Sequence, residues 1–210
     1  MNRRTILFAI LCIGWVLALP IPSQAQDFQR ISFGGDAVAW SVSEMDGFSV
    51  TLSGPDGTEI REIGDSVLFG FRPFIRFGLI RELDLEVSHE FSFGSDVDIM
   101  VSSATGIIRP FGGTGLELHA SICYGQFDWG DIPDFDSAWG WEIGASYNFK
   151  LSRSAGLIVG VAYRDLSFEV DLDKTLSDLE QTRPGTTVAV FEENADAAGV
   201  VGTVGVLISF

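Results

Sequence analysis

The residues best suited to chemistry lie in the middle of the chain. Glu117, His119 and Ser121 are spaced two apart, so an extended strand would place all three side chains on one face. An acid, a histidine and a serine are the groups of a hydrolase in which the histidine activates the serine hydroxyl. The alternative is a histidine whose hydrogen bonds are satisfied among polar side chains inside a barrel. We favour the second interpretation and predict no catalytic residue.

Four aspartates follow shortly after this group. Asp128, Asp131, Asp134 and Asp136 would supply the oxygen ligands that calcium prefers, but their spacing does not match an EF-hand loop. Acidic segments of this kind are often solvated loops. The chain also lacks a glycine-rich phosphate loop, a metal-ligand spacing and a nucleophile elbow. We therefore expect no bound metal and no cofactor, and we expect Cys123 to be an inert small residue.

Ionisable residues of both signs recur on the polar faces of alternating segments. In the segment 83–93, Asp84, Glu86 and Glu90 alternate with apolar residues. Small residues on the same faces would leave room for long charged side chains, and buried charges must be paired. We predict a network of ion pairs inside a barrel, formed by Arg72, Arg76, Glu86, Glu90, Glu117, Glu142, Arg164 and Glu169.

The elements that would position these residues are β-strands. The stretch 66–93 contains two fully alternating arms around a tight turn near Arg81 and Glu82, and each arm is long enough for a tilted membrane strand of about 9–11 residues. Further strands are expected near 98–109, 116–125, 139–149, 157–170 and 198–210. A β-bulge at Arg164 and Asp165 would explain a change of phase in the segment 157–170.

The first strand and the loops are less regular. We place the first strand at 35–52, after a polar lead-in at 26–34 and before a polar loop at 53–65. A long polar loop is expected at 171–197, with a helical turn near 176–180 and a β-prone patch at 186–191. Counting gives eight strands, with short turns alternating with longer polar segments.

The last strand presents an apolar face that ends on a C-terminal aromatic residue. Val206, Ile208 and Phe210 share this face, and a soluble protein would avoid such an exposed edge. This ending resembles the C-terminal sorting strand of bacterial outer-membrane barrels. The resemblance implies recognition by the outer-membrane barrel assembly machinery.

The N-terminus has the form of a cleavable signal peptide. Arg3 and Arg4 precede an apolar run, and the small residues Ser23 and Ala25 suit cleavage after position 25. The expected domains are thus a signal peptide at 1–25 and one barrel at 26–210.

The net charge of −16 argues against nucleic acid or anionic phospholipid as an electrostatic partner. Acidic surface loops could instead contact lipopolysaccharide through bridging divalent cations.

The apolar faces indicate which side of the barrel meets lipid. A soluble barrel of the lipocalin type would turn these faces inward. Aromatic residues gather near the strand ends, however, as they do in the interfacial belts of membrane barrels. We predict that the following residues face lipid: Phe69, Phe71, Phe77, Phe93, Tyr124, Trp139, Trp141, Tyr147 and Phe149.

The mature chain therefore resembles the small outer-membrane barrels typified by the transmembrane domains of OmpA and OmpX. The expected fold is all-β, an eight-stranded antiparallel up-and-down transmembrane barrel in the outer membrane, and we expect a monomer. The expected role is structural or adhesive, with a lumen filled by side chains and acidic loops outside.

One alternative is an enzyme that modifies lipid A or phospholipid. Lipid A deacylases use a His-x-Ser pair, but that pair faces lipid late in the barrel, whereas His119 and Ser121 are expected to face inward in mid-chain. The other alternative is a narrow channel.

Overall fold

The computed structural model describes residues 30–42, 45, 48–55, 57–64, 67–95, 97–110, 115–130, 134–190 and 194–210. The expected signal peptide at 1–25 lies outside these residues. Within the described part of the chain, no helix has both the length and the apolar character needed to cross a membrane.

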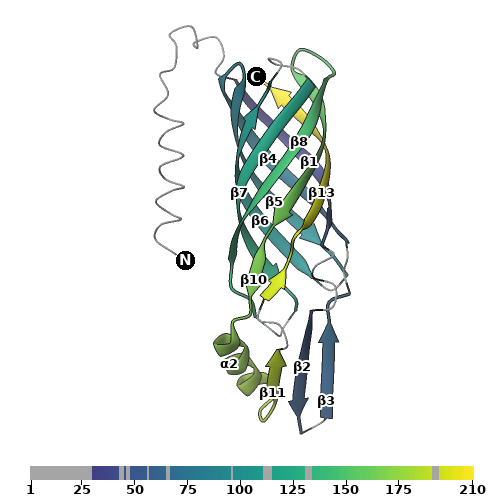
Figure 1. Ribbon diagram of the computed structural model, residues 1–210, viewed down its shortest axis with the longest axis vertical. Helices are drawn as coiled ribbons and strands as arrows, with labels where there is room; N and C mark the ends of the chain where they lie inside the picture. Colours follow the sequence, from purple (N-terminus) through teal and green to yellow (C-terminus); the bar gives the residue numbers. More distant parts are fainter. Residues whose placement is uncertain are drawn as a thin grey trace.

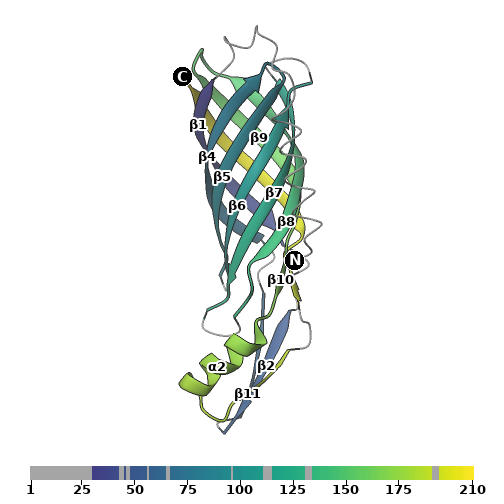
Figure 2. The ribbon, with the colours of Figure 1, turned by 90° about the vertical axis from the view of Figure 1, so that its left-hand side faces the viewer.

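The centre of the molecule is a closed antiparallel barrel of eight strands, which confirms the predicted fold (Figure 1). Its strands are β1 (Ile31–Ser41), β4 (Val67–Ile80), β5 (Leu83–Phe93), β6 (Asp98–Ile108), β7 (Gly115–Asp128), β8 (Ala138–Lys150), β9 (Ala155–Asp165) and β13 (Gly199–Ser209). The first strand pairs with both β4 and β13, so the sheet closes without an edge. Figure 2 shows the strong tilt of the strands around the barrel.

Alternation along each strand sorts the side chains to the two sides of the barrel. In β13, Val200, Val204 and Val206 are each about half exposed, whereas Val201 between them is buried. Large apolar residues therefore cover the outside. Because the lumen of an eight-stranded barrel is only wide enough for side chains, the buried set fills it.

The connections differ in length at the two ends. At the end where the C-terminus lies, the turns at 81–82 and 151–154 are short. At the other end the connections at 42–66 and 166–198 are long and carry additional elements, whereas the β5–β6 connection at 94–97 is short. Outer-membrane barrels have short periplasmic turns and long extracellular loops, so we assign the C-terminal end to the periplasm.

The first strand differs from its predicted position. Barrel strand β1 begins at Ile31 and ends at Ser41, so the segment 31–34 is part of the barrel and not a polar lead-in. The second half of the predicted strand forms β2 (Ser49–Gly54), which belongs to a separate sheet. The alternation of Val38, Trp40 and Val42 arises because these residues point inward and are buried.

The extracellular segments form an ordered domain beyond the barrel (Figures 1 and 2). Strand β2 pairs with β3 (Gly57–Glu62) on one side and with β11 (Thr187–Val190) on the other. The predicted loop at 53–65 therefore contains a strand. The predicted helical turn near 176–180 is part of the longer helix α2 (Leu172–Thr182), and β11 lies in the predicted β-prone patch.

The predicted bulge at Arg164 and Asp165 is wrong. Strand β9 ends at Asp165, and the chain continues into β10 (Ser167–Glu169), which pairs with β12 (Asn194–Asp196) outside the barrel sheet. The phase of the apolar residues changes because the chain leaves the barrel wall. Leu166, Phe168 and Val170 are buried in protein and do not face lipid.

Candidate functional site

The described part of the lumen contains two clusters of ion pairs. Arg164 lies at the centre of the first cluster. Its guanidinium donates to both carboxylate oxygens of Glu90, at 2.8 and 2.7 Å, and to Oε2 of Glu142, at 2.9 and 2.6 Å. Arg72 extends this cluster, because it donates to Asp36 at 2.7 Å and to Glu142 at 3.4 Å.

The second cluster lies closer to the periplasmic end. Arg76 donates to Glu86 at 3.0 Å and to Glu117 at 2.9 Å. Arg109 donates to the other oxygen of Glu117 at 3.1 Å and makes a bidentate pair with Asp84. Each arginine thus has two carboxylate partners, as buried charges require.

Strand register explains how these pairs form. Arg76 lies directly opposite Glu86 in the β4–β5 hairpin, and Glu142 lies directly opposite Arg164 across β8 and β9. Asp36 and Arg72 are opposite each other across β1 and β4. Oppositely charged residues at facing positions stabilise an antiparallel pair, and here each pair points into the lumen.

The structure places seven of the eight residues predicted for the charge network in the lumen, and it corrects the eighth. Glu169 is exposed in β10, outside the barrel, because the strand that was expected to carry it ends at Asp165. Sequence reasoning missed three members of the network, Asp36, Asp84 and Arg109. The sequence does contain a signal for Asp84, because this residue shares the polar face of the segment 83–93 with Glu86.

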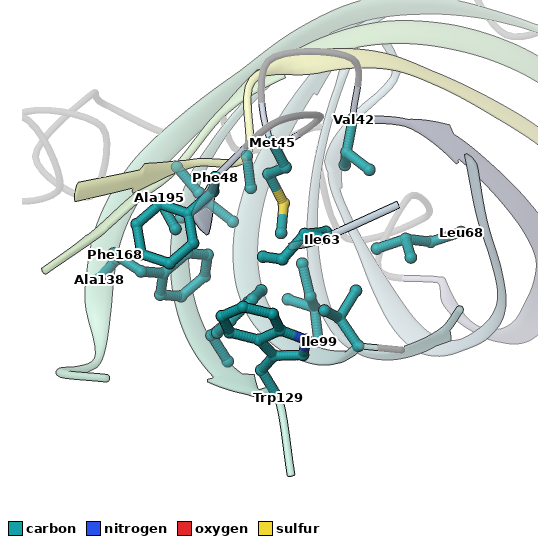
Figure 3. Packing of buried hydrophobic residues seen from close by; sticks show 14 of the residues in the cluster. Val42, Met45, Phe48, Ile63, Leu68, Ile99, Trp129, Ala138, Phe168 and Ala195 are labelled. Atoms are coloured by element: carbon teal, nitrogen blue, oxygen red, sulfur yellow. The ribbon is translucent and has the colours of Figure 1, made fainter. Parts of the chain in front are cut away.

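An apolar layer fills the extracellular half of the lumen, where only polar side chains were expected. Trp40 and Leu68 are completely buried there, as are Ile99 and Val201. This layer continues outward without a break into the core of the extracellular domain. Figure 3 shows Leu68 and Ile99 in the same cluster as residues from the loops, namely Met45, Phe48, Ile63, Trp129 and Phe168.

The two layers meet at Arg164. Its guanidinium carbon lies 4.6 Å from the centre of the Trp40 ring, so the cation stacks on the aromatic face that closes the apolar layer. Cys123 is a buried free thiol within the apolar cluster. The described part of the lumen is therefore filled by apolar side chains on the extracellular side and by ion pairs below them.

The residues suggested as a hydrolytic group do not contact one another as such a group requires. Nε2 of His119 lies 3.7 Å from Glu142, whereas the hydroxyl of Ser121 is 2.8 Å from the hydroxyl of Thr105. Glu117 is occupied by two arginines. Among the described residues, no hydrogen bond joins His119 to Ser121, whereas a nucleophile and its base must lie within hydrogen-bonding distance.

Aromatic residues lie on the outside of the barrel wall. Phe69 is 65% exposed. The ring centroids of Trp139 and Tyr124 lie 5.1 Å apart. Exposed rings also occur at the periplasmic end, where Tyr147 contacts Phe149. The remaining members of the predicted lipid-facing set, Phe71, Phe77, Phe93 and Trp141, are likewise exposed or partly exposed on outward positions. The three residues of the predicted sorting signal, Val206, Ile208 and Phe210, also point outward.

The acidic segment before β8 packs against α2. The backbone N–H of Asp134 donates to the hydroxyl of Thr175 at 3.0 Å, and its carboxylate accepts from Lys174. The hydrogen bond from Lys174 to this carboxylate raises the pKa of the lysine. Asp131 lies outside the described residues. In the remaining, described part of the chain, no three His, Cys, Asp or Glu side chains are grouped in a way that could hold a metal ion.

Comparisons with known proteins agree with this fold. No protein-family model matches the sequence, and no curated protein sequence matches it. Among solved structures, the outer membrane protein OprG from Pseudomonas aeruginosa matches with a TM-score of 0.54 at 12% identity, covering 87% of this chain and 96% of that one. Neisserial surface protein A matches with a TM-score of 0.50 at 14% identity, covering 86% of this chain and 97% of that one. The chain therefore has the fold of the small eight-stranded outer-membrane β-barrels.

Proposed function

We propose that the protein is a non-enzymatic outer-membrane barrel that holds a folded extracellular domain and makes its contacts at the cell surface through that domain. The observation that carries this proposal is the continuous apolar core. Residues of the extracellular segments, including Met45, Phe48 and Leu179, pack in one cluster with Trp40 and Leu68 of the barrel. Such packing fixes the domain on the barrel as a rigid unit.

The extracellular domain also presents apolar side chains to water. Leu172 and Leu176 are 45% and 46% exposed and lie four residues apart on α2, so they share one face of the helix. Ile60 in β3 is 63% exposed. Unlike the apolar belt of the barrel, these residues have no lipid to cover them, and exposed apolar groups of this kind are suited to binding a protein partner.

Two features support this role over the alternatives. The pairing of Ser121 with Thr105 leaves His119 without a nucleophile, which argues against a lipid hydrolase. The two side-chain layers in the lumen argue against a channel. Neisserial surface protein A, which shares the fold, is named as a surface protein.

Adhesion of whole cells tests the proposal. Cells that express the protein should adhere to at least one of a panel of immobilised extracellular proteins and cell layers more strongly than cells carrying an empty vector. The variant L172S/L176S should lose most of this adhesion. The matched variant D173S/E180S changes two exposed polar residues of the same helix and should retain it. Equal adhesion by both variants, or no adhesion above the vector control, would contradict the proposal.

A further inference from the structure

The periplasmic mouth of the barrel contains a cavity with an unusual lining. Its volume is about 290 Å³, and it lies where the ends of β1, β8, β9 and β13 meet the short turns. Among the described residues, Asp84 is the one acidic side chain in the lining. The basic side chains in the lining are Arg30, Arg76, Arg81, Arg109, Lys150 and Arg153.

The lining is mostly basic, whereas the whole protein is acidic. The chain has 29 acidic residues and 13 basic ones, yet six of those 13 basic residues line this single cavity. The net charge of −16 predicts no attraction to anions. This value is an average over the whole chain, however, and it does not describe the basic lining of the cavity. Local charge, and not the average, decides what a cavity attracts.

The described carboxylates that line the cavity or hold its arginines do not neutralise it. Arg76 and Arg109 are held by Asp84, Glu86 and Glu117, so this inner group carries one net negative charge. Arg30, Lys150 and Arg153 take part in no described ion pair and bring the total to two positive charges before Arg81 is counted. Glu82 and the C-terminal carboxylate belong to the same end of the barrel, but neither is part of the lining.

Neutral hydrogen-bond donors complete the lining. Asn148 contributes an amide, and Ser32, Ser152 and Ser154 contribute hydroxyl groups. The hydroxyl oxygen of Ser152 already accepts from two backbone N–H groups, at 3.3 and 3.0 Å. Its hydrogen is therefore available to donate to an acceptor in the cavity.

We infer that this cavity binds a phosphate group. A phosphate offers several strongly accepting oxygens and up to two negative charges, so it can engage several cations at once, whereas one carboxylate matches a single arginine fork. Two sources of phosphate reach this position. One is the headgroup of a phospholipid in the inner leaflet, because Phe33, Phe149 and Phe210 cover the outer wall at the same end. The other is a soluble phosphate ester in the periplasm. The inference is independent of the role proposed for the extracellular domain.

Binding measurements on the full chain in nanodiscs of phosphatidylcholine test the inference. In the soluble arm, inorganic phosphate and glycerol 3-phosphate are titrated by calorimetry. In the lipid arm, phosphatidylglycerol is added to the nanodiscs and its retention is measured by native mass spectrometry. The variant R30Q/K150Q/R153Q removes three exposed cations of the lining that take no part in the described ion pairs of the lumen. The matched control R61Q/K174Q/R183Q removes the same charge from the extracellular domain.

We expect the wild-type protein to bind in at least one arm. The mouth variant should bind about 10-fold more weakly, because it loses three charge-assisted partners, and the control should change by less than about twofold. Binding of phosphatidylglycerol alone identifies the lipid headgroup as the ligand, and binding of the soluble esters alone identifies a periplasmic ligand. The inference is overturned if neither arm shows binding, if both variants lose equal affinity, or if acetate binds as tightly as phosphate.

Discussion

Arg164 shows how a single residue makes a charged lumen possible. Its side chain is only 1% exposed, yet the guanidinium nitrogens donate to Glu90 and Glu142 and the guanidinium carbon lies over the Trp40 ring. Glu90 in turn accepts from Ser92 at 2.7 Å. Burying such groups is costly, and the cost is offset only when nearly every donor and acceptor has a partner.

Replacement of Arg164 by methionine should therefore destabilise the barrel strongly. The variant leaves Glu90 without its guanidinium partner and removes one of the two arginines that hold Glu142, so we expect a loss of about 3–5 kcal/mol in the free energy of unfolding. Urea titration of the protein in lipid vesicles, followed by tryptophan fluorescence, measures this loss. The control R61M removes a partly exposed arginine paired with Glu59 and should cost less than about 1 kcal/mol. Equal losses in the two variants would contradict the assignment.

The sequence predicts residues of this network well where pairing is local. Arg76 and Glu86 lie on facing arms of one hairpin, so alternation and a tight turn suffice to bring them together. Asp36 pairs with Arg72 across β1 and β4, which are separated by an entire extracellular excursion. Alternation within one segment says nothing of the register between such distant strands. Glu169 was misplaced for a related reason, because the pattern does not mark where a strand leaves the barrel.

At the scale of elements, α2 shows how a helix can be fixed on a β-barrel protein. Asp171 caps the helix by accepting from the backbone N–H of Lys174 at 3.0 Å. Thr175 and Leu179 point inward and are buried, while Leu172 and Leu176 point outward. The sequence predicts only one turn of this helix, because its apolar stripe is short and lies in a polar loop.

Replacement of Thr175 by valine should increase local opening of α2 without lowering the stability of the barrel. Valine keeps the shape of the side chain but cannot accept the hydrogen bond from Asp134, at a cost of about 1–2 kcal/mol. Amide hydrogen exchange in Leu172–Thr182 should accelerate roughly tenfold, since 1.4 kcal/mol corresponds to a factor of 10. The melting temperature of the barrel should not change.

Thr182 provides a matched control in the same helix. Its hydroxyl is exposed and donates to the carbonyl oxygen of Asp178 within the helix, so T182V removes no contact with the rest of the protein. Its exchange pattern should stay close to that of the wild type. If T175V exchanges no faster than T182V, the helix is held by its apolar residues alone.

At the scale of the whole molecule, the barrel and the extracellular domain share one core. The sequence predicts the number of barrel strands and their outward faces, because lipid imposes a strict period of two on them. It does not predict the apolar layer in the lumen. Trp40, Ile99 and Val101 face inward in the extracellular halves of β1 and β6, which is the opposite of the pattern in the hairpin that shows the clearest alternation.

This arrangement of layers predicts that the protein does not conduct ions. A path along the lumen would have to pass the apolar layer around Trp40 and then the ion pairs of Arg72 and Arg164. Beside Arg72 and Arg76 lies a cavity of about 20 Å³. That volume holds about one water molecule. Purified protein in planar bilayers in 1 M KCl should therefore show no discrete current steps, whereas an open porin under the same conditions should show them. Steps whose ion selectivity changes in the variant R72Q would contradict a sealed lumen, because they would place the conducting path beside Arg72.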